Sequence, residues 1–365
     1  MLIRTPDYYE QFKCIADKCT DTCCAGWQVD VDDRSFAYYK TITGPFGDRL
    51  KSVMVDAKKG AEGQFRIRED GRCPFLNDCN LCDLYTELGE DALCVTCEQY
   101  PRYTTEYGNV REIGIALSCI TAAEIILSHE GTAQFSERED SDATFSLNSI
   151  DGMLYLALTK AREKAYEIVT DGKSDIRSRM INLLCFSEGV QRYINDPDRI
   201  KEYVKEYVPG ETAGRFKENS KAYLNIWKHY LKQVIIKKEW VDLYRDCEKM
   251  YSANDYADAI GITDEYAKEY ENILVYFVYR YFLKACMDRD VLTKAKTAVV
   301  GTLMIIHCHM ALWKKNGGEL SFAERVDAAH LYSRELEHSE ENFARMAGLY
   351  RRKKIFSVKN LIKLI

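Results

Sequence analysis

The stretch TDEYAKEYENILVYFVYRYFLKACMD, residues 263–288, decides the class of fold. Its apolar side chains recur at steps of three or four residues, which is the spacing of one face of an α-helix. Thr263 precedes this pattern and is expected to be the N-cap. A stripe of this kind is typical of protein core, although its tyrosines would also suit an amine-binding pocket, because aromatic faces attract ammonium groups. The stripe consists of Tyr266, Tyr270, Ile273, Phe277 and Tyr281.

Helical patterns continue on both sides of this stretch. They cover residues 148–169, 175–194 and 220–235 before it, and the segment FAERVDAAHLYSREL and the C-terminus after it. We find no alternation of strands and helices that would build a parallel sheet, so the sequence predicts a mainly α-helical fold.

The most apolar run, TAVVGTLMIIHCHMALW at 297–313, is short for a membrane span and is expected to be a buried core helix. His307 and His309 lie two positions apart and would not share a helix face, which disfavours metal binding there.

Composition narrows the function classes. The 365 residues are 46% hydrophobic and 30% charged, as expected for a soluble globular protein, and the net charge of -6 argues against nucleic-acid binding driven by overall charge. The N-terminal MLIRTPDYYEQFKC lacks the apolar run of a signal peptide, so we expect a cytoplasmic protein. The cytosol keeps thiols reduced, which makes a disulfide framework improbable.

Cysteine is distributed unevenly. Four of the 14 cysteines (Cys185, Cys247, Cys286 and Cys308) lie in helical patterns, where buried cysteine acts as a small hydrophobic residue. The other ten lie in the first 119 residues, and two C-x2-C pairs among them are separated by eleven residues, the layout of a four-thiolate site. Zinc and iron–sulfur clusters both use such sites. The ten are Cys14, Cys19, Cys23, Cys24, Cys73, Cys79, Cys82, Cys94, Cys97 and Cys119.

The neighbours Cys23 and Cys24 constrain the arrangement. Adjacent side chains of an extended chain point to opposite faces, so these two thiols are expected to serve different environments. The sequence thus predicts a domain at 1–131, irregular in structure and built around one or two metal centres. A polar linker is expected at 132–148, and a multi-helix domain at 149–365.

The cysteine motifs resemble a known family. CTDTCCAGWQVDVD, GRCPFLNDCNLCDLYTELGEDALCVTCEQYPR and GIALSC are similar to motifs of bacterial flagellin lysine-N-methylases, which carry a YkgJ-type cysteine-cluster domain. The likeness is dense over residues 8–128, and RRKKIFSVKNLIKLI at the C-terminus adds to it. All ten cysteines match, as do Trp27, Pro74 and the segment 100–102. One departure is Ile120, where the family pattern has proline.

The resemblance implies an enzyme: an S-adenosylmethionine-dependent protein-lysine N-methyltransferase acting on flagellin or a similar surface protein. It further implies an iron–sulfur cluster of the 4Fe-4S type, with its ligands among the ten matching cysteines. Ten cysteines exceed the four ligands of one such cluster, so two clusters, two zinc sites, or one cluster plus free thiols remain open. Trp27 and Arg102 would then lie at the cofactor, although Trp27 also suits plain packing and Arg102 could offset thiolate charge. No spacing selects the base that would remove the lysine proton.

Two other function classes fit the same residues. A non-catalytic module, stapled by zinc or iron thiolates, would bind a partner protein without binding the methyl donor. An electron-transfer protein would need an exposed cluster with a reversible potential.

The C-terminal run, residues 345–365, has seven basic residues and no acidic ones. Its apolar positions are expected to dock on the helical domain, and contact with an acidic partner or a membrane surface is the alternative.

Overall fold

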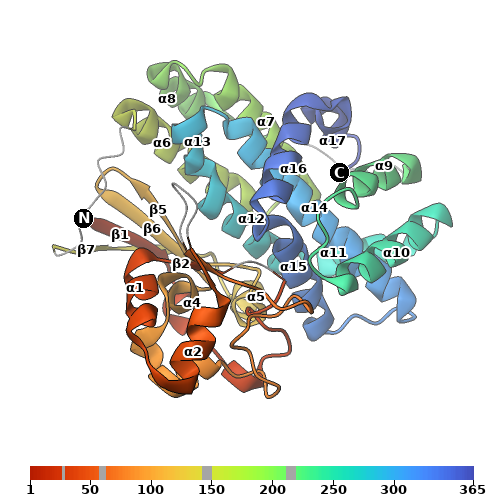
Figure 1. Ribbon diagram of the computed structural model, residues 1–365. Coiled ribbons are helices and arrows are strands. Elements are labelled where there is room, and N and C mark those ends of the chain that lie inside the picture. The colour runs from red at the N-terminus through yellow and green to blue at the C-terminus, as the bar shows by residue number, and fades with distance from the viewer. Residues whose placement is uncertain (27–28, 57–62, 142–149, 211–218) are drawn as a thin grey trace.

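Helices dominate the computed structural model, which describes residues 1–26, 29–56, 63–141, 150–210 and 219–365 (Figure 1). The C-terminal region is built from α6 (Gly152–Val169), α7 (Ile176–Arg192), α8 (Pro197–Glu206), α9 (Ser220–Tyr230), α10 (Lys238–Ser252), α11 (Ile262–Glu265), α12 (Ala267–Tyr281), α13 (Ala285–Asp288), α14 (Val291–Lys315), α15 (Phe322–Glu337), α16 (Glu340–Arg352) and α17 (Val358–Leu361). The 3₁₀ turns here are η4 (Asp258–Gly261), η5 (Phe282–Lys284) and η6 (Lys354–Phe356). The prediction of a mainly helical fold with a C-terminal multi-helix region is confirmed.

Helix α14 is the centre of this region. It packs against α7, α10, α12, α15 and α16, and the side chain of its N-cap Asp290 accepts a hydrogen bond from the backbone of Thr293 at 3.0 Å. Among the described residues, α14 is the one helix long and apolar enough to cross a membrane, yet 94% of its apolar window is buried inside the protein. Its burial is that of a core helix, as the sequence predicts.

The N-terminal part is less irregular than predicted, because it contains two small sheets. One has the strand order β5–β6–β1–β7, with β1 parallel to β6 and the other pairs antiparallel; the second has the order β2–β4–β3. The strands are β1 (Leu2–Pro6), β2 (Asp30–Val31), β3 (Met54–Val55), β4 (Gly63–Phe65), β5 (Arg102–Tyr107), β6 (Val110–Ile115) and β7 (Phe135–Glu139). The helices between them are η1 (Tyr9–Gln11), η2 (Ala16–Lys18), α1 (Asp33–Thr41), α2 (Gly44–Val53), α3 (Asp83–Leu88), η3 (Glu90–Ala92), α4 (Val95–Gln99) and α5 (Ile120–Ser128).

Strand β7 lies within the segment expected as a linker. It pairs antiparallel with β1 along its whole length, and the ring of Phe135 stacks on Tyr166 and Tyr279 with centroid distances of 4.8 and 4.9 Å. These long-range contacts order a segment whose polar composition indicated a loop. Residues 142–148 of the expected linker lie outside the described residues, and the division into domains stays a prediction.

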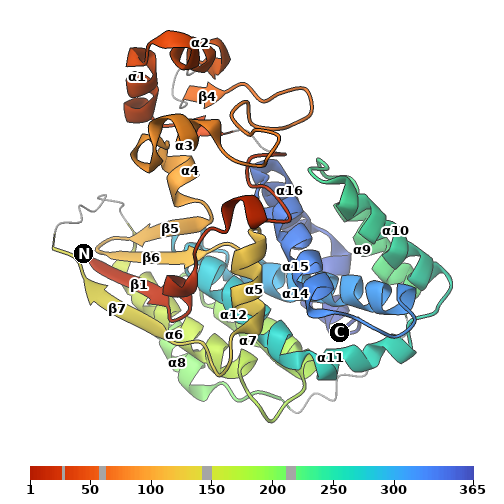
Figure 2. The same cartoon turned by 90° about the horizontal axis from the view of Figure 1, so that it is seen from below.

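Two hydrophobic cores organise the chain. A small core is formed by buried residues from the segment between Val29 and Cys94 of the sequence, and it includes the buried thiols of Cys73 and Cys94. The large core extends from Tyr8 through α5 to Ile365 and therefore joins the four-stranded sheet to the helices. In Figure 2 the lobe of α1 to α4 projects away from the sheet and the helical region.

The stretch at 263–288 is interrupted rather than continuous. Thr263 is buried inside α11 and its hydroxyl donates to the Ile260 carbonyl at 2.8 Å, while Tyr266 occupies the N-cap position of α12. The expectation that Thr263 is the N-cap is wrong, because its hydroxyl is engaged in the preceding turn. Docking of the C-terminal run is confirmed, since Phe356, Leu361 and Ile365 are fully buried.

A buried ion pair fastens the sheet to the helices. Arg162 on α6 donates two hydrogen bonds to the Glu112 carboxylate on β6, at 2.7 and 2.5 Å. Arg4 on β1 donates to the same carboxylate at 2.8 Å. A buried carboxylate needs such partners, because desolvation opposes its charge.

We predict that Arg162→Met lowers the free energy of unfolding by ~3 kcal/mol, because it leaves the buried carboxylate with Arg4 alone. Urea denaturation measures this, and Lys160→Met, on the exposed face of α6, is the control with an expected change within ~0.5 kcal/mol. Adding Glu112→Gln to Arg162→Met should recover part of the loss. Equal free energies of unfolding for Arg162→Met and the control Lys160→Met would contradict the prediction.

Candidate functional site

Helix α15 carries an unusual amount of buried polar surface. It begins with a capping box, in which the Ser321 hydroxyl and the Glu324 carboxylate each bond the other's backbone N–H. Further along, charged and polar side chains point into the protein instead of solvent: Arg325, His330, Ser333, Arg334 and Glu335. Buried polar groups of this density need partners, and several of the partners lie in the cysteine-rich N-terminal segment.

The first partner is Asp21, in the middle of CTDTCC. Its carboxylate lies 2.8 Å from His330 Nε2, 3.7 Å from Arg334 Nη1, and is paired with the Lys237 ammonium. Burial opposes the charge of Asp21, but the His330 hydrogen bond and the Arg334 and Lys237 charges outweigh it and hold the pKa well below its ordinary value. Asp21 therefore stays ionised and ties the thiol loop to α15.

Arg334 completes this attachment. Its Nη2 donates to the carbonyls of Thr22 at 2.8 Å and Ala25 at 2.5 Å, which bracket Cys23 and Cys24. The red N-terminal segment runs beside α5 toward α15 in Figure 2. One arginine thus fixes the backbone of the turn that carries the vicinal thiols.

The sulfur atoms of Cys23 and Cys24 lie 3.8 Å apart. They do not point to opposite faces, because the two residues form a turn and not an extended strand. Their surroundings overlap: the Cys23 thiol raises the pKa values of Cys19 and Cys119 and also that of Cys82, and the Cys24 thiol raises the pKa of Cys97. That the two thiols serve different environments stays a prediction.

The remaining thiols form two neighbourhoods around this pair. In the first, burial raises the pKa of Cys119 to about 12, and the nearby Cys19 and Cys23 thiols add to the effect. Burial also raises the pKa of Cys19, and the Cys23 and Cys14 thiols add to this effect. Each thiolate would repel the next, so the thiols favour their protonated form until a cation joins them.

The second neighbourhood lies in the small core. Burial raises the pKa of Cys73 to about 11, with a further contribution from Cys82 and Cys94. A hydrogen bond between Cys94 and Cys97 lowers the pKa of Cys94 and raises that of Cys97. Cys94 is the N-cap of α4, so its C-x2-C partner Cys97 falls in the first helical turn. Cys79 is exposed.

In the described parts of the chain, no three cysteine, histidine or acidic side chains form a ready-made metal-binding group. The chemistry of the donor set still fits a thiolate-binding metal, because soft thiols with raised pKa values are gathered in two places and a cation would displace their protons. The ten cysteines remain predicted ligands.

The other predicted site residues are dispersed. Trp27 lies outside the described residues. The Arg102 guanidinium lies over the rings of Tyr9 and Phe12, at 6.0 and 5.2 Å from their centroids, whereas the cation that acts on Cys23 is Arg334. Spacing could not single out Arg334, because it is 311 positions from Cys23 along the chain.

The tyrosine stripe does not line one pocket. Tyr270 bonds His309 Nδ1 at 2.9 Å, Tyr281 donates to Glu337 at 2.7 Å, and Tyr266 lies under Arg325. His307 packs against the ring of Tyr223 instead, and burial lowers the pKa of both histidines to about 3. The interpretation of the tyrosine stripe and of His307 and His309 as parts of the core is confirmed by this burial.

Several residues near the thiols were missed by sequence reasoning. Tyr100 donates to the Ser118 carbonyl at 2.8 Å, next to Cys119, and lies 3.2 Å from His338 Nε2. Glu335 accepts hydrogen bonds from the backbone of Ile236 and Lys237, and burial raises its pKa to about 7. The sequence signal that could have pointed to these residues is the segment HLYSRELEH, 330–338, in which titratable side chains are concentrated.

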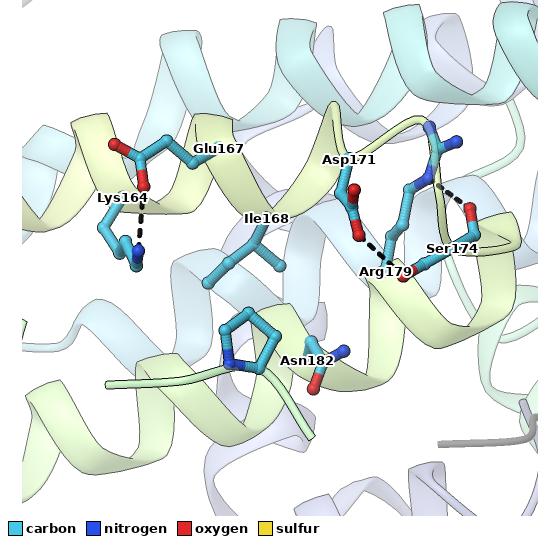
Figure 3. A pocket seen from close by; sticks show the side chains of 8 residues that line it. Lys164, Glu167, Ile168, Asp171, Ser174, Arg179 and Asn182 are labelled. Carbon is cyan, nitrogen blue, oxygen red and sulfur yellow. Dashed lines mark hydrogen bonds and ion pairs between the residues drawn. The ribbon is translucent and has the colours of Figure 1, made fainter. Parts of the chain in front are cut away.

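Two cavities lie away from the thiols. One, of about 180 Å³, lies where α6 ends and α7 begins (Figure 3). Both cations among its described lining residues are paired with carboxylates, Lys164 with Glu167 at 2.8 Å and Arg179 with Glu271 at 2.6 Å, while Asp171 accepts a hydrogen bond from Ser174 at 2.6 Å. These residues therefore offer no unpaired cation for an anionic ligand. The other cavity lies near the C-terminus, between α7, α14 and the segment that joins α16 to α17.

Together these features define a mainly helical protein whose helix α15 holds a thiol-rich N-terminal loop. Comparison with known families identifies its relatives: residues 162–364, more than half of the chain, match the family described as FliB lysine N-methylase C-terminal domain. The chain belongs to this family. The match lies in the helical region that contains α15, whereas the resemblance seen in the sequence rested mainly on residues 8–128.

Individual relatives come from Salmonella. A lysine-N-methylase of Salmonella typhimurium is 26% identical over 150 residues, 40% of this chain and 37% of the relative. The flagellar biosynthetic protein FliU of Salmonella muenchen is 26% identical over 172 residues, 46% of this chain and 95% of the relative. The similarity thus spans little more than a third of the first relative's length. No solved structure matches the chain.

We predict a pH dependence of stability from Glu335. Its pKa rises from 4.5 to about 7 on folding, so the folded protein keeps a proton that the unfolded chain has lost between these values. The contribution of Glu335 to stability should therefore fall by ~2 kcal/mol from pH 4.5 to 7 and then level off. Asp21 acts in the opposite direction and only below its ordinary value of 3.8, so the two windows are separate. The buried histidines His307, His309 and His338, whose pKa values are lowered to about 3, also act in the opposite direction to Glu335 up to pH 6.5, so the Glu335 contribution is isolated by comparison with a variant that lacks it.

Urea denaturation across this pH range is the measurement, and Glu335→Gln is the control that removes the titrating group. The difference in unfolding free energy between the two proteins should change with pH in the stated direction. Parallel pH profiles would contradict the assignment.

Proposed function

We propose that the protein is an S-adenosylmethionine-dependent protein-lysine N-methyltransferase that acts on flagellin or a similar surface protein. The observation that carries the proposal is membership of the lysine N-methylase family across residues 162–364. The flagellar name of the FliU relative supports flagellin as the substrate. We place the protein in the cytoplasm, where thiols stay reduced.

We further propose that the ten N-terminal cysteines supply the ligands of an iron–sulfur centre of the 4Fe-4S type, which takes four thiolates per cluster. Cysteine thiolates are the usual ligands of such clusters. The two thiol neighbourhoods and the turn held by Arg334 support this assignment, since they gather sulfur donors beside the helix that belongs to the family match. When bound, the cluster would supply a site beside the thiols that orients the donor or holds the fold.

Methyl transfer places demands on the chain itself. The lysine amine must lose its proton and be held in line with the methyl group of the donor. Burial raises the pKa of Glu335 to about 7. Its carboxylate oxygens, however, accept hydrogen bonds from the backbone of Ile236 and Lys237 and its side chain is buried, so we assign Glu335 to the contact between α15 and the segment before α10 and leave the proton acceptor unassigned. His338 stays neutral because burial lowers its pKa to about 3, and it positions the Tyr100 hydroxyl.

The test uses protein purified without oxygen. We expect visible absorption with about four irons and matching acid-labile sulfide per chain, and addition of methyl groups to flagellin lysines, detected by mass spectrometry, only when S-adenosylmethionine is present. Cys94→Ser should lose iron and methyl transfer together, because Cys94 lies in the small core among four other thiols.

Cys308→Ser is the matched control. Cys308 is buried in α14, within the helical core, and its replacement should leave the iron content unchanged. Colourless protein with stoichiometric zinc would contradict the proposal of an iron–sulfur cluster. Binding of flagellin without methyl transfer would overturn the enzyme and favour a thiolate-stapled binding module.

A further inference from the structure

The second cavity lies beneath the basic C-terminal run. Its volume is about 280 Å³, and it opens to solvent and is bordered by α7, the N-terminal half of α14 and the segment from the end of α16 to the start of α17. Because the apolar side chains of this segment are buried in the core, its basic side chains remain exposed around the cavity. The charged and polar residues of the lining are Glu188, Lys296, Arg351, Arg352, Lys353, Lys354 and Ser357.

Lys296 is the unusual member of this lining. Its side chain is only 6% exposed, and its ammonium donates to the Tyr350 carbonyl at 2.9 Å. Over the described ranges, no carboxylate forms an ion pair with it. Burial lowers the pKa of Lys296, and the more distant Asp290 and Glu188 offset this only in part. An ammonium has three donors, so two remain for another acceptor.

The other cations at the rim differ in how they are engaged. Arg351 is committed to Asp290 and lies 3.6 Å from Asp288. Arg352 uses its Nε to reach the Gly348 carbonyl at 3.1 Å, and within the described chain neither it nor Lys353 or Lys354 forms an ion pair with a carboxylate. Glu188, which is exposed, is the acidic residue of the lining.

We propose that this cavity binds a phosphate group, seated between the buried ammonium of Lys296 and the exposed guanidinium of Arg352. Phosphate matches these donors, since guanidinium bonds it in a fork and ammonium acts as a point charge. The volume admits a phosphate group with part of the molecule that carries it. In the cavity of Figure 3 both cations are paired with carboxylates, and this contrast indicates that the positive excess here is a binding feature.

This site is separate from the thiols and does not depend on methyl transfer. The phosphate could belong to a free small molecule or to a lipid headgroup, and the two sources share the same recognition chemistry. The experiment therefore uses two probes at low ionic strength, where phosphate contacts are least screened. One is inorganic phosphate, titrated calorimetrically. The other is sedimentation with vesicles of phosphatidylcholine, with or without an equal part of phosphatidylglycerol.

Lys296→Met and Arg352→Gln test the site, and Lys160→Met on α6 is the control for loss of one positive charge elsewhere. We expect saturable binding of one probe by the wild-type protein and an affinity about tenfold weaker in each cavity variant, with Lys160→Met unchanged. Arg352 is exposed, so its variant reports binding even if Lys296→Met fails to fold.

Loss of phosphate binding in both cavity variants would identify a free phosphate compound as the ligand class. Loss of binding to the anionic vesicles alone would identify a lipid headgroup. The proposal is overturned if neither probe binds saturably, or if Lys160→Met weakens binding as much as the cavity variants do.

Discussion

The attachment of Asp21 and its neighbouring carbonyls to α15 is the interaction on which the rest of the structure depends. The half-buried Asp21 carboxylate lies against His330, Arg334 and Lys237, and the same Arg334 bonds two carbonyls around Cys23 and Cys24. Each group alone would be costly to bury, so removal of one partner leaves the others without compensation. The thiol turn and the helical region therefore depend on each other, although they are far apart in sequence.

This dependence gives the organisation of the chain a physical reason. The small core around Cys73 and Cys94 and the large helical core are separate, and the loop from Cys19 to Ala25 contacts both sides, because Cys24 packs against the small core and the Ala25 carbonyl accepts a hydrogen bond from Arg334 on α15. Thiols in both neighbourhoods have raised pKa values because burial and neighbouring sulfur disfavour the thiolate. A cation bound there would reverse both effects, so metal binding and the attachment of the lobe to α15 are expected to strengthen each other.

The sequence predicted those parts of the fold that depend on local pattern. The apolar run of α14 indicated a core helix, and the C-x2-C spacing placed Cys94 and Cys97 together. It could not predict β7, whose order comes from pairing with β1, or the role of Asp21, whose partners lie more than 200 positions away. Arg102 was preferred to Arg334 because proximity along the chain was the available guide, whereas long-range ion pairs leave no trace in spacing.

The most direct test is amide hydrogen exchange of residues 19–26, measured by mass spectrometry in wild-type protein and in Arg334→Met, with Arg102→Met as the control. Loss of two hydrogen bonds from a buried guanidinium should speed exchange of this loop by about tenfold or more, while Arg102→Met leaves it unchanged. Equal protection of the loop in the wild-type and Arg334→Met proteins would show that α15 does not hold the thiol turn, and it would contradict the account.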